Sequence, residues 1–182
     1  MTRIGGIIFA RMNSSRLPGK AMIEIDGVSL IERVIERAKQ IARLSRSLGF
    51  NTQLRSEEPD IKAETTVYIA DTMGEMGLWY AMVNIAFIGG SLVERGGHNP
   101  VEAAQLETFI LHGPFTHNAE EKYYQLNSLG ISVQIENADI LADELKILRN
   151  KDPNKEFKRV KPFLEQNDTA LITALDTIRS AI

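Results

Sequence analysis

The residues best suited to hold a ligand lie in a glycine-rich stretch in the middle of the chain. An apolar run, IAFIGG at 85–90, leads into SLVERGGHNP at 91–100 and then into a helix-like segment. The glycines let the backbone approach a bound group closely. The helix that follows would direct its unpaired N–H groups at an anion. The stretch therefore predicts a loop that binds phosphate or another anion.

Four polar side chains in or beside this loop are candidate ligand contacts. We expect Ser91, His98 and Asn99 to meet a phosphate or a sugar carboxylate, and Glu102 to accept hydrogen bonds from ribose hydroxyls. A local structural role is the alternative, because Asn99 and Glu102 also have the spacing of a helix capping box. A histidine such as His98 is also common at a surface without any part in catalysis.

Two further loops have the same position between a strand-like run and a helix-like segment. In the first, Met73 and Gly74 could form one wall of a base pocket, because a thioether packs adaptably on a flat ring. Capping of the next helix by Thr72 and Glu75 explains that loop as well. The second loop covers 113–118. Since ligands bind beyond the carboxyl ends of parallel strands, we expect all three loops to converge on one crevice.

The elements that must position these loops alternate along the chain. Short runs rich in Ile, Val and Phe are each followed by a polar turn and a helix-like segment, which is typical of an α/β fold. The expected strands are 6–10, 22–25, 52–55, 67–70, 85–89, 109–112 and 132–135. The expected helices are 29–48, 74–83, 100–106, 119–129, 138–150, 154–166 and 168–181. Capping boxes at Ser29–Glu32 and Asn118–Glu121 are expected to start the first and the fourth of them. The prediction is a Rossmann-like parallel sheet with helices on both faces, followed by a C-terminal helical pair.

Composition narrows the function classes. With 182 residues, 43% of them hydrophobic, the chain can bury the core of one ordinary domain. A net charge of −3 gives no general attraction to nucleic acid, and we expect none as a partner. The absence of cysteine excludes disulfides and thiol catalysis. The first apolar run is too short for a membrane span and is followed directly by Arg11, so we expect a soluble cytoplasmic protein without a leader. We also expect no cofactor and no bound metal.

Three motifs in a fixed order carry a family resemblance. They are DTMGEM at 71–76, GGSLVERGGHNPVEA at 89–103 and GPFTHN at 113–118. Together they resemble the C-terminal domain of the Kdo (3-deoxy-D-manno-octulosonic acid) transferases of lipopolysaccharide biosynthesis. In that family DTMGEL, GGSLV-x-x-GGHNP-x-EP and GP-x-x-x-N segments follow in this order. The likeness extends from near residue 42 to the end.

The resemblance implies a glycosyltransferase of the GT-B fold, which has two Rossmann-like domains. The C-terminal domain holds the donor CMP-Kdo, whereas the other half carries the acceptor site and the catalytic base. The implied partners are CMP or CMP-Kdo, and a lipid A precursor through the missing acceptor domain. Contact with the inner membrane is left open, and no catalytic residue is expected here. The implied donor-binding residues are Met73, Gly74, Glu75, Ser91, Gly97, His98, Asn99, Glu102 and Asn118.

The chain departs from this family pattern at three places. Ala103 stands where the family usually has proline, and Phe115 stands where it usually has histidine. A basic PRHPER-type loop, expected before the helix that ends near Gly49, is missing. That loop should help to neutralise the donor phosphate, so its loss is expected to weaken donor binding.

The first forty residues carry a different resemblance. The stretch IIFARMNSSRLPGKAMIEIDGVSLIERVIERAK at 7–39 is similar to the start of sugar-nucleotide cytidylyltransferases, including the CMP-Kdo synthetases and the spore-coat polysaccharide type. In that family an ARM-x-S-x-RLPGK loop holds the triphosphate of CTP. The resemblance implies a phosphate loop at Arg11, Ser14, Arg16 and Lys20. Ordinary surface cations in a polar loop are the alternative.

The two resemblances suggest a chimera. We expect a single Rossmann-like domain over 1–182, in which the strand, loop and helix of 1–40 replace the first unit of a donor-binding segment at 41–182. Three hypotheses follow. The chain is a CMP-Kdo binding domain of a Kdo transferase-like enzyme, incomplete for catalysis; a cytidylyltransferase-like fragment that binds CTP; or an inert chimeric fold.

Overall fold

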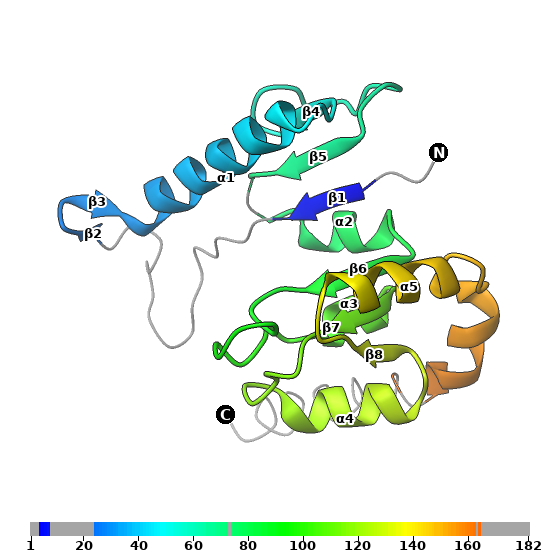
Figure 1. The fold of residues 1–182 in the computed structure, drawn as a ribbon. Helices are drawn as coiled ribbons and strands as arrows, with labels where there is room; N and C mark the ends of the chain where they lie inside the picture. The colour runs from blue at the N-terminus through cyan, green and yellow to red at the C-terminus, as the bar shows by residue number, and fades with distance from the viewer. Residues whose placement is uncertain (1–3, 8–23, 73, 163, 165–182) are drawn as a thin grey trace, which may run out of the picture. The chain divides into compact units, whose positions relative to one another are not determined.

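The computed structural model describes residues 4–7, 24–72, 74–162 and 164, and Figure 1 shows their elements. The chain divides into two compact units, residues 1–76 and residues 77–182. Each unit has its own three-stranded parallel sheet. The expectation of one domain over 1–182 stays a prediction.

The sheet of the first unit has the strand order β1-β5-β4. Its strands are β1 (Ile4–Ile7), β4 (Thr52–Leu54) and β5 (Val67–Ala70). The central strand, β5, pairs in parallel with both neighbours, so that Val67 lies opposite Ile4 on one side and opposite Thr52 on the other. A strand of the cytidylyltransferase-like segment thus pairs directly with a strand of the transferase-like segment.

Helix α1 (Leu30–Ser47) covers this sheet and begins at the predicted capping box. The N–H of Glu32 donates to the Ser29 hydroxyl at 3.3 Å, and the Glu32 carboxylate accepts from the Ser29 N–H at 2.8 Å. Two small residues of the helix, Ala38 and Ala42, are buried against Leu54 of β4 and its neighbours. Their size lets the helix approach the strands closely.

A short hairpin precedes α1. Strands β2 (Glu24–Ile25) and β3 (Val28–Ser29) pair antiparallel across Asp26 and Gly27, whose φ angles are 54° and 72°. Positive φ at both central residues suits an Asp-Gly pair in a two-residue hairpin. The expectation of a strand at 22–25 is confirmed for residues 24–25. This strand pairs antiparallel with β3 and not in a parallel sheet, because the turn sends the chain back on itself.

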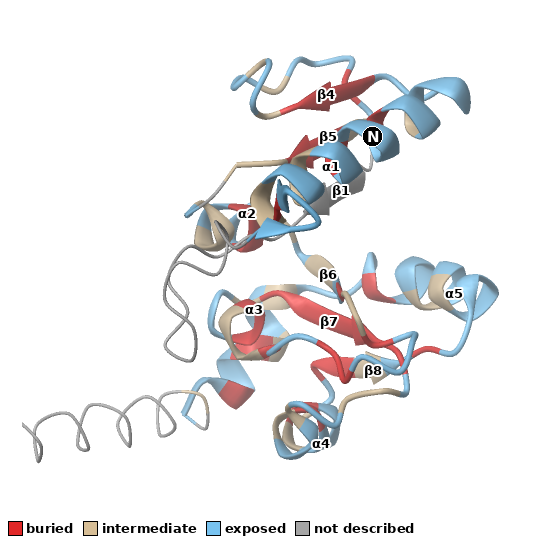
Figure 2. Cartoon of the chain, turned by 90° about the vertical axis from the view of Figure 1, so that its left-hand side faces the viewer, coloured by how far each residue is buried: buried red, intermediate tan, exposed pale blue. Residues whose placement is uncertain are grey.

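The second unit is built on the strand order β6-β7-β8. The strands β6 (Ile85–Ile88), β7 (Phe109–His112) and β8 (Ser132–Gln134) are all parallel. All four residues of the central strand β7 are buried, and Figure 2 shows it as a continuous buried band. Its side chains are therefore packed on both faces, as parallel strands require.

Helices connect and cover these strands. Helix α2 (Met76–Ala81) precedes β6, α3 (Val101–Gln105) joins β6 to β7, and α4 (Glu120–Ser128) joins β7 to β8. Helix α5 (Ala138–Leu148) follows β8, and residues 153–162 are also helical. The rings of Phe157 and Phe109 lie 5.4 Å apart, so this last segment packs on the central strand.

The predicted fold class is confirmed: parallel strands are flanked by helices, and strands 67–70 and 109–112 have the predicted bounds. Of the C-terminal helical pair, the first helix lies at 153–162, and the second, at 168–181, falls outside the described residues. Among the residues that the structure describes, no helix is both long and apolar enough to cross a bilayer.

Candidate functional site

The glycine-rich loop after β6 folds back on the end of its own strand. The N–H of Gly97 donates to the Gly90 carbonyl at 3.0 Å, and the N–H of His98 donates to the Gly89 carbonyl at 3.2 Å. Gly90, Gly96 and Gly97 have φ angles of 75°, 83° and 67°. Only glycine adopts this backbone readily, so the spacing GG-x5-GG is a requirement of the turn.

Four successive carbonyls of this loop are held by donors from the next loop and from α4. The side-chain amide of Asn118 donates to Arg95 O at 2.8 Å and to Gly97 O at 3.3 Å, and its backbone N–H donates to Gly96 O at 3.0 Å. The hydroxyl of Tyr123 donates to His98 O at 2.7 Å. These bonds fix the peptide planes of residues 95–99.

A second junction joins the same two loops through Ser91, whose side chain is completely buried. Its hydroxyl donates to the Ile88 carbonyl and accepts from the Gly113 N–H at 2.9 Å, while its carbonyl accepts from the Phe115 N–H at 2.9 Å. Ser91 was predicted as a ligand contact. Its hydroxyl is instead occupied by protein groups, so any contribution to binding comes from holding the loops together.

Asn99 and Glu102 do not form a capping box. The Asn99 side chain accepts from the Val101 N–H at 3.1 Å, and the N-cap of α3 is Pro100, which has no side-chain cap bond. Asn99 and His98 are exposed. Glu102 lies in the first turn of α3, with a carboxylate oxygen near Gly77 of α2.

The loop after β5 belongs to the first unit and contains three predicted site residues. Met73 lies outside the described residues, and Gly74 has a φ of 83°. The Glu75 carboxylate forms two hydrogen bonds with the Arg55 guanidinium, at 2.6 and 3.1 Å, and accepts another from the Thr72 hydroxyl. The hydrogen bonds from Arg55, and to a smaller extent the one from Thr72, lower the pKa of Glu75.

Helix α2 starts only at Met76, so Thr72 and Glu75 do not form the predicted helix cap. Their bond to each other and the Arg55 ion pair instead tie the loop after β5 to the end of β4. Asp71 makes a parallel link, because its carboxylate accepts from the Ser56 N–H at 2.9 Å and from the Ser56 hydroxyl at 2.6 Å.

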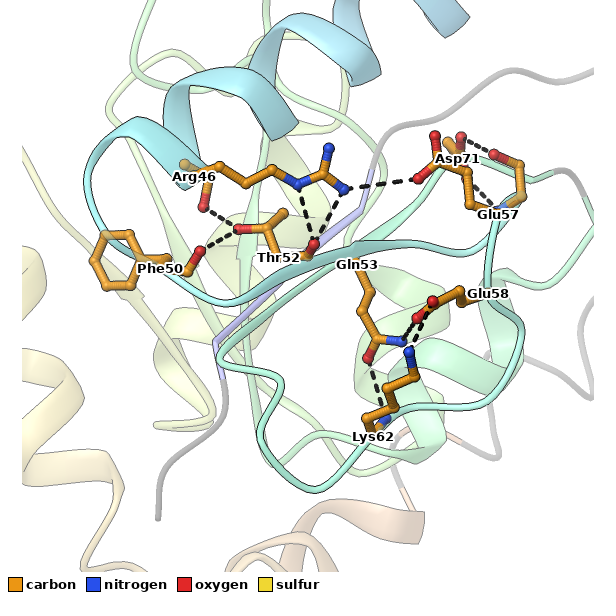
Figure 3. Close-up of polar contacts among 10 residues, drawn as sticks. Arg46, Phe50, Thr52, Gln53, Glu57, Glu58, Lys62 and Asp71 are labelled. Atoms are coloured by element: carbon orange, nitrogen blue, oxygen red, sulfur yellow. Dashed lines mark hydrogen bonds and ion pairs between the residues drawn. The ribbon is translucent and has the colours of Figure 1, made fainter.

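Polar side chains that were not predicted from the sequence also hold β4 and the segment that follows it (Figure 3). Arg46 donates to the Thr52 carbonyl at 3.1 and 3.2 Å. Gln53 is buried, and its side chain accepts from the Lys62 N–H at 3.0 Å and donates to the Glu58 carboxylate. No local sequence pattern signals these bonds, because their partners lie five to nine residues apart in an irregular segment.

The predicted phosphate loop at Arg11, Ser14, Arg16 and Lys20 lies outside the described residues. The elements on either side of it are described: β1 ends at Ile7, and the β2–β3 hairpin begins at residue 24. Within the described ranges, no group of three or more His, Asp and Glu residues could hold a metal ion.

The buried residues that support the glycine-rich loop in the second unit were not predicted from the sequence either. The rings of Tyr123 and His112 lie 4.5 Å apart, and both side chains are buried. The His112 ring lies between Gly113 O, 2.7 Å from Nδ1, and the Asn127 side-chain oxygen, 3.1 Å from Nε2. Burial raises the pKa of Tyr123, so its hydroxyl keeps the proton that it donates to His98 O.

This arrangement defines a class: a Rossmann-like α/β chain of the GT-B C-terminal type, with a glycine-rich turn at the carboxyl end of β6. Comparisons with known proteins agree with that class. The crystal structure of the C-terminal CMP-Kdo binding domain of WaaA from Acinetobacter baumannii is similar, with a TM-score of 0.60 and 29% identity. The match covers 75% of this chain and 68% of that one.

The sequence relatives are 3-deoxy-D-manno-octulosonic acid transferases. The Haemophilus influenzae protein is 34% identical over 128 residues, covering 70% of this chain and 30% of the relative. The Rickettsia felis protein is 30% identical over 155 residues, covering 83% of this chain and 33% of the relative. This chain is thus homologous to the Kdo transferases over most of its length, and it spans about a third of theirs.

The N-terminal resemblance is confirmed as well. A family model described as cytidylyltransferase matches residues 6–49. This range includes the second half of β1, the β2–β3 hairpin and all of α1. Both resemblances identified from the sequence therefore hold.

Proposed function

We propose that this chain binds CMP-Kdo as the donor-binding domain of a Kdo transferase-like glycosyltransferase of lipopolysaccharide biosynthesis. The observation that carries the proposal is the turn at 95–99, whose four carbonyls are held by Asn118 and Tyr123. Similarity to a CMP-Kdo binding domain supports the choice of ligand.

The chemistry of the donor fits this turn. CMP-Kdo carries a phosphodiester and a sugar carboxylate, and both are anions. The backbone N–H groups of Gly96 and Asn99, with the exposed side chains of His98 and Asn99, would supply hydrogen-bond donors to one of them. Glu102 would accept from ribose hydroxyls. The family resemblance also assigns Met73, Gly74 and Glu75 of the first unit to donor binding, and this assignment stays a prediction.

Transfer to an acceptor needs more than this chain. A glycosyltransferase requires a base to activate the acceptor hydroxyl, and the family resemblance places that base in the other GT-B domain. We therefore propose donor binding, and not the transfer step, for residues 41–182. A lipid A precursor, and a peripheral position at the inner membrane, would involve that further domain.

Titration calorimetry with CMP-Kdo, and with CMP as the stable analogue, tests the proposal. Wild-type protein should bind, and Asn99→Ala should weaken binding about fivefold by removing one hydrogen bond. Asn150→Ala is the matched control, because Asn150 is an exposed asparagine at the end of α5 and should leave the affinity unchanged. Absence of heat at millimolar CMP-Kdo would reject donor binding and favour the inert fold.

The cytidylyltransferase match favours a second candidate, CTP binding by the N-terminal loop. Arg11, Arg16 and Lys20 would neutralise the triphosphate, but phosphate contacts alone give little selectivity. CTP should then bind more tightly than CMP, and Arg16→Ala should abolish the difference. Equal affinities for the two nucleotides would exclude this candidate.

A further inference from the structure

The hydroxyl of Tyr123 connects a buried aromatic pair to the backbone of the glycine-rich loop. It donates to His98 O at 2.7 Å, and its ring packs on the buried His112 ring at a centroid distance of 4.5 Å. The side chain has 1% exposure, so it cannot contact a ligand itself. Its neighbour Tyr124 is 75% exposed.

The bond to His98 O determines where the next amide points. In a trans peptide the C=O of one residue and the N–H of the following residue point in opposite directions, and the chain has no cis peptide bond among its described residues. Holding His98 O toward the buried Tyr123 therefore turns the Asn99 N–H away from the protein interior. Asn99 itself is exposed, which agrees with an N–H directed away from the protein interior.

The loop has little freedom to replace this contact. A Cβ on Gly97 would lie 3.2 Å from the Tyr123 hydroxyl and 3.2 Å from Phe115 O, so the loop backbone packs directly on both groups. Gly96 and Gly97 have positive φ, and because glycine has no side chain their backbone could also adopt other conformations. A loop of this kind needs external contacts to keep one conformation.

We infer that Tyr123 is a positioning residue of the anion site, fixing the peptide between His98 and Asn99 so that the Asn99 N–H can donate to the bound ligand. This inference rests on the proposed function for its ligand, an anionic nucleotide sugar. It adds a residue that lies in α4, outside the three motifs. Tyr123 acts through the backbone, and the ligand contact is made by Asn99.

The test compares Tyr123→Phe with Tyr124→Phe, which removes the same hydroxyl from an exposed position. Amide spectra of the free proteins are recorded first. Tyr123→Phe should shift the Asn99 amide resonance, because the carbonyl of its peptide loses a hydrogen bond, and Tyr124→Phe should not. An unmoved Asn99 resonance in Tyr123→Phe would overturn the inference.

CMP-Kdo is then titrated into each protein. Tyr123→Phe should bind about fivefold more weakly than wild type, with a shift of less than a few degrees in Tm, and Tyr124→Phe should bind as wild type does. Equal affinity of Tyr123→Phe and wild type overturns the positioning role and leaves the proposed function standing. If wild type fails to bind, the proposed function fails, and a shifted Asn99 resonance still supports the peptide orientation.

Discussion

Substitution of Gly113 by alanine tests how tightly the two loops of the second unit are joined. A Cβ at this position would lie 2.1 Å from Ser91 O and 2.4 Å from Ser91 C. Both are backbone atoms and cannot rotate away as a side chain could. The loops would have to separate by about 1 Å, an overpacking that costs about 1–3 kcal/mol.

That separation would also stretch two hydrogen bonds. Gly113 N–H to Ser91 Oγ and Phe115 N–H to Ser91 O, both 2.9 Å, each contribute about 1 kcal/mol. The total loss expected for Gly113→Ala is about 3–5 kcal/mol. Since a domain of this kind is stable by about 5–15 kcal/mol, the variant should still fold, with a Tm lower by about 10 °C.

Urea unfolding followed by tryptophan fluorescence measures this loss. The chain has one tryptophan, Trp79, which is buried in α2 of the second unit and reports on that unit. Gly77→Ala is the matched control, because its Cβ would meet only atoms at 3.9 Å or beyond and alanine favours the helix. A free energy of unfolding for Gly113→Ala within 1 kcal/mol of wild type would show that the two loops are not tightly joined at Ser91 and Gly113.

Three further predictions concern the supporting structure. Phe157→Ala should lower the free energy of unfolding by about 3–5 kcal/mol in the same urea assay, because Phe157 is fully buried against the central strand; a loss below 1 kcal/mol would mean that the last helical segment is not docked. Ser29→Ala should lower the free energy of unfolding by about 1 kcal/mol, because the α1 cap is lost. Ser47→Ala, at the other end of the helix, should lower it by less than 0.5 kcal/mol. Thermal unfolding followed by circular dichroism measures both losses, and equal losses would contradict the cap. Arg55 holds the pKa of Glu75 below 4.5, so the ion pair stabilises the fold above that pH and is lost as the pH falls. The Tm of wild type should therefore drop more steeply below pH 4.5 than the Tm of Glu75→Gln. Parallel curves of Tm against pH would contradict this linkage.

Local patterns predicted most of the fold. Continuous apolar runs such as 67–70 and 109–112 identify buried parallel strands directly, since every residue of such a strand is packed. The Ser29–Glu32 cap was also correct, because both of its partners lie within one helical turn. The turn at Asp26 and Gly27 was missed although its dipeptide is a hairpin signal, since the sequence analysis placed that strand by its hydrophobicity alone.

The errors in the site share one cause, which is competition from partners distant in sequence. Glu75 does not cap α2 because Arg55, twenty residues earlier, takes its carboxylate. Asn118 does not cap α4 because its amide holds Arg95 O, twenty-three residues away. Ser91 was recognised from its motif, but its burial became visible only when β7 placed Gly113 beside it. Tyr123 carries no sequence signal, because any large buried residue of α4 has the same pattern.

The central claim is that the turn at 95–99 binds the anionic part of a CMP-sugar. A crystal structure of the protein soaked with CMP tests it most directly. The phosphate should lie within hydrogen-bond distance of the backbone N–H groups of Gly96 and Asn99. A phosphate bound instead at Arg11, Arg16 and Lys20, with the turn at 95–99 unliganded, would contradict it.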